Sequence, residues 1–127
     1  MIACDTSTLS ALLSQTQGSD IDLAANALSQ RLLWLPPATY AEALSNPRTS
    51  DQAEALLDGL KMLPIQEGFW LRVAKTRRTL LRRGLKARLA DALIAQSCID
   101  ADVPLITRDR DFRHFAAHCG LKLAAPL

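Results

Sequence analysis

Several features that mark common protein classes are missing from this chain of 127 residues. No apolar run approaches the roughly 20 residues that a membrane-spanning helix needs, so we expect no contact with a membrane. The three cysteines are odd in number and lack the close spacing of metal-binding pairs. No charged leader precedes the apolar N-terminal residues, and together these absences argue against secretion and for a cytoplasmic protein. A glycine-rich phosphate-binding loop is also absent.

The composition is that of a folded protein. Hydrophobic residues make up 49% of the chain and charged residues 22%, which is typical of globular rather than disordered sequences. A chain of this length buries roughly two-thirds of its unfolded surface in one core. No internal repeat, low-complexity stretch or linker divides it. We therefore expect a single domain over residues 1–127.

The charges are unevenly distributed along the chain. Residues 1–67 carry eight acids and three bases, which gives a net charge of −5, and the remainder carries +7. Most of the positive excess lies in one basic segment with no acid between Glu67 and Asp91. Its members are Arg72, Lys75, Arg77, Arg78, Arg82, Arg83, Lys86 and Arg88. This segment favours a polyanionic partner, with a merely solvated helix face as the alternative.

Short apolar segments alternate with segments of helical periodicity. The predicted strands cover residues 1–5, 32–35, 62–65, 103–107 and 121–124. The predicted helices cover residues 7–14, 21–32, 37–46, 51–60, 67–83, 88–100 and 112–118. Strands that alternate with helices in this way predict an α/β fold with a parallel sheet covered on both faces.

Four acidic residues are placed where such a fold would bring them together. Asp5 ends the first predicted strand, Asp109 follows the strand at 103–107, and Glu42 and Asp91 lie on predicted helices. The functional crevice of a parallel sheet lies beyond the carboxyl ends of its strands. Carboxylates gathered there repel one another unless a cation offsets their charge. The placement therefore predicts a divalent-metal site.

Three segments resemble the PIN-domain nucleases, most closely the toxins of VapBC-type toxin–antitoxin pairs. They are the opening IACDTSTLSALL, the segment PPATYAEAL, and ADALIAQSCIDADVPLITRDRDF. The resemblance extends over essentially the whole chain. It implies a PIN-like α/β/α sandwich with a central parallel β-sheet and a metal-dependent endoribonuclease activity. It further implies an RNA substrate, a small antitoxin protein that covers the site, and a homodimer.

The resemblance also assigns roles to the acids. It implies a catalytic cluster of Asp5, Glu42, Asp91 and Asp109 that binds one or two Mg²⁺ or Mn²⁺ ions, for which carboxylate oxygens are suitable ligands. We expect Asp5 and Asp91 to be direct ligands, and Asp109 and Glu42 to hold the metal or its bound water. The alternative for Asp5 is to cap the helix that follows it, and the alternative for Glu42 is a surface charge or a helix cap. Asp111 stays open as a further candidate, because either aspartate of TRDRDF could face the metal. Asp109 is favoured because it lies nearer the strand end.

Neighbouring polar and basic residues complete the hypothesis. Thr6, Ser7 and Thr107 could orient the ligands or contact phosphate, although helix capping by Ser7 and a loop hydrogen bond from Thr107 are favoured alternatives. Four arginines are candidates for contact with RNA, against salt bridges or a solvated face. They are Arg82, Arg83, Arg108 and Arg110. We expect Trp34 and Trp70 to pack in the core rather than to stack on bases.

Other functions fit the sequence less well. A catalytically silent PIN scaffold that binds RNA or protein would have little reason to keep clustered, mutually repelling carboxylates. A receiver-type phosphoacceptor domain would need an acid and a lysine where the chain has Gln66 and Ala124. His114 and His118 lack the intervening glutamate of a zinc protease, and Cys4 has no base tied to it by a motif.

Overall fold

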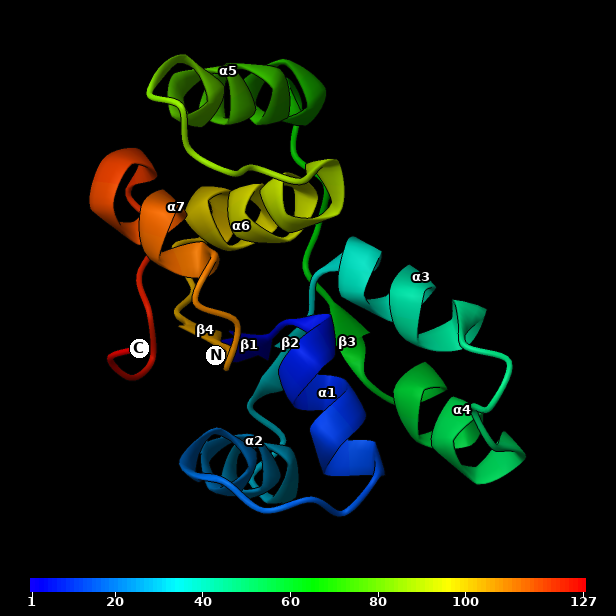
Figure 1. Cartoon of the computed structure of the whole chain (residues 1–127). Helices are drawn as coiled ribbons and strands as arrows, with labels where there is room; N and C mark the ends of the chain where they lie inside the picture. Colours follow the sequence, from blue (N-terminus) through cyan, green and yellow to red (C-terminus); the bar gives the residue numbers. More distant parts are fainter.

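The computed structural model describes residues 1–127 and shows helices on both sides of a central sheet (Figure 1). The strands are β1 (Ile2–Cys4), β2 (Leu33–Leu35), β3 (Lys61–Met62) and β4 (Leu105–Ile106). The helices are α1 (Thr6–Leu13), α2 (Ser19–Ser29), α3 (Pro37–Ser45), α4 (Asp51–Asp58), α5 (Phe69–Arg82), α6 (Leu89–Ala101) and α7 (Phe112–Cys119). The expected α/β/α sandwich with a parallel sheet is confirmed.

The order of the strands determines where a site can form. The sheet has the order β3-β2-β1-β4, and every pair is parallel. The chain leaves β1 in one direction to form β2 and β3, and returns to form β4 on the other side of β1. The crevice at this reversal, between the carboxyl ends of β1 and β4, is where ligands bind in open α/β sheets. A receiver-type order of 2-1-3-4-5 differs from the observed order, so that alternative is wrong.

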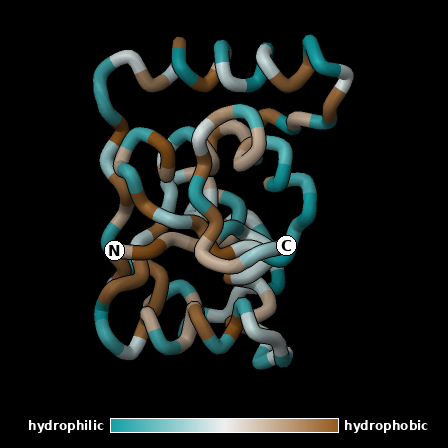
Figure 2. Tube along the Cα trace, turned by 90° about the vertical axis from the view of Figure 1, so that its left-hand side faces the viewer, coloured by the Kyte–Doolittle hydropathy of each residue, from teal (hydrophilic) through white to brown (hydrophobic).

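Two hydrophobic cores lie on opposite faces of the sheet, because alternate strand residues point in opposite directions. Ala3 and Leu105 pack with α5, α6 and α7. Cys4 and Ile106 pack in the other core, with residues of α1 to α4. Cys4 is buried in β1, and burial raises the pKa of its thiol. Figure 2 shows hydrophobic strand segments between the outer helices.

The third strand is shorter than the sequence predicts and shifted toward the N-terminus. The prediction was residues 62–65, whereas β3 ends at Met62. The Leu63 N–H still donates to the Leu35 carbonyl at 2.8 Å. Pro64 follows and has no N–H to continue the ladder, so the strand stops there.

The last predicted strand, 121–124, is reduced to a single bridge. Leu123 pairs with Leu105 in parallel orientation. The Ala124 N–H donates to the Leu105 carbonyl at 2.8 Å, and the Leu105 N–H donates to the Lys122 carbonyl at 2.9 Å. The segment therefore extends the sheet beyond β4 by one residue pair. None of the seven helices combines the length and the apolar composition of a membrane-spanning segment.

The two tryptophans lie in different environments. Trp34 is partly buried, as predicted, with the Lys61 ammonium 5.2 Å from its ring centroid. Trp70 is 67% exposed, so its predicted place in the core is wrong. Its neighbour Phe69 is the buried residue, together with Val73 one turn later on α5. Adjacent helical positions point about 100° apart, so only one of the two aromatic rings faces the core.

Candidate metal centre

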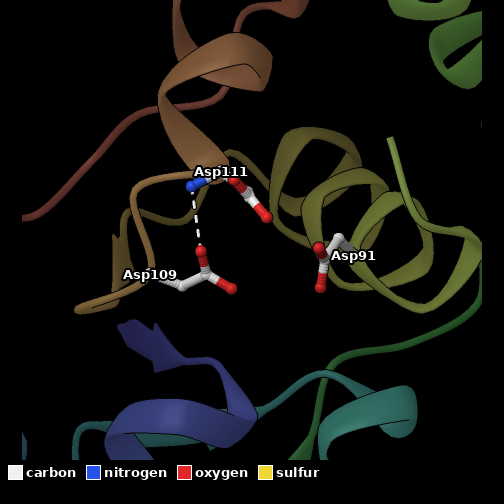
Figure 3. A group of neighbouring side chains, drawn as sticks. All are labelled: Asp91, Asp109 and Asp111. Atoms are coloured by element: carbon white, nitrogen blue, oxygen red, sulfur yellow. Dashed lines mark hydrogen bonds between the residues drawn. The ribbon is translucent and has the colours of Figure 1, made fainter. Parts of the chain in front are cut away.

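Three carboxylates converge beyond the carboxyl ends of β1 and β4. Asp91 lies in the first turn of α6, Asp109 in the loop after β4, and Asp111 immediately before α7 (Figure 3). One oxygen of each carboxylate lies within 4.8 Å of the others. All three side chains are partly buried, so solvent reaches the group. A group with this geometry could hold a small cation with oxygen ligands.

Hydrogen bonds within the loop after β4 hold two of these carboxylates in place. The Asp109 N–H donates to the Thr107 hydroxyl at 3.0 Å, which is the loop hydrogen bond predicted for Thr107. The Asp111 N–H donates to Asp109 Oδ1 at 2.9 Å. Lys86 Nζ lies 3.0 Å from Asp111 Oδ2. The sequence places Lys86 in the basic segment but contains no sign of this pairing, which joins two distant loops.

Asp5 is the most buried acid of the site, with 3% of its surface exposed. It caps α1 by accepting from the Thr8 N–H at 3.1 Å. Its oxygens also accept from the Ser7 hydroxyl at 2.7 and 2.9 Å and from the Thr107 hydroxyl at 2.8 Å. Asp5 is therefore the cap, and the capping role predicted for Ser7 is wrong. Burial raises the pKa of Asp5 despite these hydrogen bonds, which act to lower it.

Glu42 approaches the same crevice from α3. Its side chain is exposed, and Oε1 accepts from the Thr6 hydroxyl at 2.5 Å. Thr6 follows Asp5 directly, so this bond ties α3 to the start of α1. The Glu42 charge is near enough to raise the pKa of Asp91.

The electrostatics of the cluster favour a bound cation. The pKa of Asp91 is raised to about 6, first because the carboxylate is partly buried and next because Asp109 is close. Asp111 and Glu42 raise it further, and the Arg88 charge lowers it. A carboxylate that is desolvated and surrounded by like charges gains from a positive ligand. Carboxylate oxygens of this kind suit Mg²⁺ or Mn²⁺.

The four arginines proposed for RNA contact have different surroundings. Arg108 forms a two-point ion pair with Asp20, at 2.8 Å from Nε and 2.9 Å from Nη2. The structure thus shows the salt-bridge alternative for Arg108, with a partner that the sequence does not indicate. Arg110 is exposed and makes no ion pair. Arg82 and Arg83 are exposed at the C-terminal end of α5.

The acids predicted from the sequence therefore lie at one edge of the sheet, but they differ in their contacts there. Asp91 and Asp109 join Asp111 in the three-carboxylate group, so both aspartates of TRDRDF face it. Asp5 is linked to Asp109 through the Thr107 hydroxyl. Glu42 is connected through Thr6 and through its charge. His114 and His118 take no part in the group.

A family sequence model and several solved structures match this chain. The sequence model of the PIN domain matches residues 2–118. Curated protein sequences give no significant match. Among solved structures, VapBC2 from Rickettsia felis bound to a DNA fragment from their promoter contains a chain that is 19% identical, with a TM-score of 0.74 and 97% of each chain covered.

Two further structures share the fold. A chain of FitAcB from Neisseria gonorrhoeae is 20% identical with a TM-score of 0.69, covering 99% of this chain and 98% of that one. A chain of VapBC-5 from Mycobacterium tuberculosis, a member of the VapBC family of toxin–antitoxin systems, is 19% identical with a TM-score of 0.65. Its alignment covers 96% of this chain and 95% of that one.

Proposed function

This chain belongs to the PIN-domain family, and we propose that it is a divalent-metal-dependent endoribonuclease that serves as the toxin of a toxin–antitoxin pair. The observation that carries the proposal is the convergence of Asp91, Asp109 and Asp111 at the reversal point of the sheet. Nothing in the scaffold requires three carboxylates within 4.8 Å of one another, because like charges that close destabilise the folded chain. A bound divalent cation would offset that repulsion.

The residues present fit a Mg²⁺ or Mn²⁺ ion. In the proposal Asp91, Asp109 and Asp111 would hold it with hard oxygen donors. The sequence also predicts that Asp5 is a direct ligand. Its oxygens already accept from Ser7, Thr8 and Thr107, and this supports a role beside the metal, where Asp5 fixes the position of Thr107 and thereby of Asp109.

The chemistry follows from the positions of the side chains. The metal, when bound, supplies positive charge against the scissile phosphate and lowers the pKa of an attacking water. Glu42 is exposed at the mouth of the site and uses only Oε1 in its bond to Thr6, so the other oxygen is free to accept the proton of that water. Thr107 keeps Asp109 oriented throughout. Arg110, next to Asp109 in the chain and unpaired, contacts the phosphate backbone.

The proposed partners follow from charge and from family. RNA is the polyanion, and Arg82 and Arg83 extend the positive surface along α5. A small antitoxin covers the site, as the toxin–antitoxin complexes among the structural relatives suggest. A second copy of the chain forms a homodimer. We place the activity in the cytoplasm, where RNA is available and the three free cysteines stay reduced.

Cleavage of end-labelled total transfer RNA tests the proposal. The purified chain should cut it with Mn²⁺ and should not cut it with EDTA. Asp91→Asn should slow cutting by roughly 100-fold or more, because it removes a ligand charge. Asp102→Asn is the matched control, since Asp102 is exposed, pairs with Lys122 and takes no part in the cluster. If transfer, ribosomal and messenger RNA all remain intact while Mn²⁺ binds, the silent-scaffold alternative holds instead.

A further inference from the structure

One cation is paired directly with the three-carboxylate group. Lys86 Nζ lies 3.0 Å from Asp111 Oδ2, and no other ion pair of the chain involves Asp91, Asp109 or Asp111. Arg88 influences Asp91 only through its charge. The Lys86 side chain is 52% exposed and that of Asp111 is 27% exposed, so the pair lies at the open mouth of the group.

The backbone on both sides of Lys86 is fixed. Gly84 ends α5 with φ +72°, a conformation that strains other residues, and the Leu85 N–H bonds back into the last turn of the helix at 3.0 Å. On the other side, Arg77 Nε donates to the carbonyl of Ala87 at 2.7 Å, and Ala87 is buried. The Cα atom of Lys86 is therefore held near the acids, while the long side chain remains free to swing.

We infer that Lys86 is a catalytic residue, which pairs with Asp111 in the metal-free protein and contacts the scissile RNA phosphate once Asp111 binds the metal. This inference rests on the proposed function. When the Asp111 carboxylate ligates a divalent ion, the Lys86 ammonium loses its partner and is repelled by the new positive charge. The RNA phosphate that the metal site receives then offers the ammonium a negative charge. A compact ammonium on a flexible stem suits such a transfer between two anions.

Arg108 is less suited to this role. Arg108 is held by two hydrogen bonds from its guanidinium to Asp20, and that carboxylate also accepts from the Thr8 hydroxyl at 2.9 Å. It would have to abandon a complete ion pair to reach phosphate. Lys86 alone has as its partner a carboxylate that metal binding takes away, so its release is coupled to the loading of the site.

The test combines Mn²⁺ affinity with RNA cleavage in three variants. Lys86→Gln removes the charge, Lys86→Arg keeps it, and Lys122→Gln is the matched control. Lys122 also pairs with an aspartate, at 2.7 Å from Asp102, and this pair shares no residue with the acid cluster. Isothermal calorimetry measures Mn²⁺ binding without RNA, and single-turnover cleavage of labelled RNA is measured at saturating Mn²⁺.

Lys86→Gln should bind Mn²⁺ roughly threefold to fivefold more tightly, because a partly exposed competing charge has been removed. The same variant should cleave RNA roughly tenfold more slowly or worse, because a cation that acts on the phosphate is gone. Lys86→Arg should return Mn²⁺ affinity to the wild-type value, and Lys122→Gln should change neither quantity.

Unchanged Mn²⁺ affinity in Lys86→Gln, or unchanged cleavage at saturating Mn²⁺, overturns the inference. Failure of the proposed function gives a different pattern, in which the wild-type chain itself cuts no RNA. Even then the calorimetry tests whether Lys86 competes with Mn²⁺ for Asp111. Equal Mn²⁺ affinity with and without the lysine would show that it does not.

Discussion

Two aspartates on α6 have different partners, and their pKa values are shifted in opposite directions. Asp100, in the last turn, accepts from Arg72 Nε at 2.9 Å and Nη2 at 2.7 Å, and from Gln96 at 2.8 Å. The Arg72 guanidinium holds the pKa of Asp100 below its usual value. Asp91, in the first turn, has no such partner, and its pKa is raised to about 6. The fold neutralises one carboxylate with its own cation and leaves the other beside further acids.

The helix dipole would produce the reverse pattern. A negative charge is stabilised at the N-terminus of a helix and destabilised at the C-terminus. Asp91 occupies the favourable end yet has the raised pKa, so burial and neighbouring acids outweigh the dipole. Asp100 occupies the unfavourable end and has the lowered pKa because of Arg72. Asp100 is therefore an acid that stabilises the fold, and Asp91 is an acid that is available to a ligand.

The largest expected effect comes from exchanging each aspartate for asparagine. Asp91→Asn should lower the RNA cleavage rate by roughly 100-fold or more, because a ligand charge of the site is lost. The metal-free variant should unfold at the same temperature as the wild type or higher, since a repelling charge is gone. Asp100→Asn should do the opposite: it should unfold at a lower temperature and still cleave. Cleavage assays and calorimetric melting in EDTA measure both quantities.

The opposite pattern of stability and activity would contradict the roles assigned to Asp91 and Asp100. If Asp91→Asn melts well below the wild type in EDTA, Asp91 is structural and the proposed site loses its main ligand. If Asp100→Asn is as stable as the wild type but inactive, the functional acid lies at the other end of α6.

A smaller effect is expected from the hydroxyl that bridges two acids. Thr107→Val removes the donor to Asp5 and the acceptor of the Asp109 N–H while keeping the shape of the side chain. The unsatisfied buried groups should cost about 1–3 kcal/mol of unfolding free energy. Cleavage should fall roughly tenfold, because the loop that carries Asp109 loses its anchor.

Thr76→Val is the matched control for that change. Thr76 donates to Gln96 at 2.5 Å, and Gln96 in turn donates to Asp100. Neither of these hydrogen bonds involves a residue of the acid cluster. The Thr76→Val variant should have a lower free energy of unfolding than the wild type and the same RNA cleavage rate. Equal loss of activity in both variants would show that Thr107 acts only by supporting the fold.

The smallest effect is a dependence of stability on pH. Asp91 binds a proton more readily in the folded chain, with a pKa of about 6, than in the unfolded chain. Its contribution to stability is therefore largest at low pH, falls as pH rises from about 4 to about 6, and is constant above that. Asp100 behaves in reverse, because its lowered pKa stabilises the fold above its ordinary pKa and this contribution is lost in acid.

Urea denaturation in EDTA between pH 3 and pH 7, at intervals of about half a unit, measures this contrast. The stability of Asp91→Asn relative to the wild type should grow over the window from about pH 4 to about pH 6. A difference that does not vary with pH would mean that Asp91 titrates normally.

The edge that carries the site was predictable from local patterns. Asp5 and Asp109 each follow an apolar segment that must be buried, and parallel topology brings the ends of such segments together. Asp91 was identifiable because it interrupts an otherwise apolar helical stretch. Glu42 was included for its place on a predicted helix. That is weak evidence by itself, because short aliphatic helices with one acid are common, and the resemblance to PIN domains supported it.

Other features depend on tertiary contacts that local patterns do not encode. The turn after Thr107 directs both Asp109 and Asp111 into the group, because a hydrogen bond from one backbone to the other side chain closes the loop. Lys86 meets Asp111 only because the connection between α5 and α6 passes beside α7. Trp70 and Phe69 are neighbouring aromatic residues, and the rotation of α5 against its core decides which one is buried.

The most direct test of the account is a crystal structure with Mn²⁺, using anomalous scattering to locate the ion. The account predicts an anomalous peak bounded by Asp91, Asp109 and Asp111, with carboxylate oxygens roughly 2.0–2.4 Å from it. Absence of a peak among these three residues in crystals that contain saturating Mn²⁺, or peaks only on isolated surface carboxylates, would contradict it.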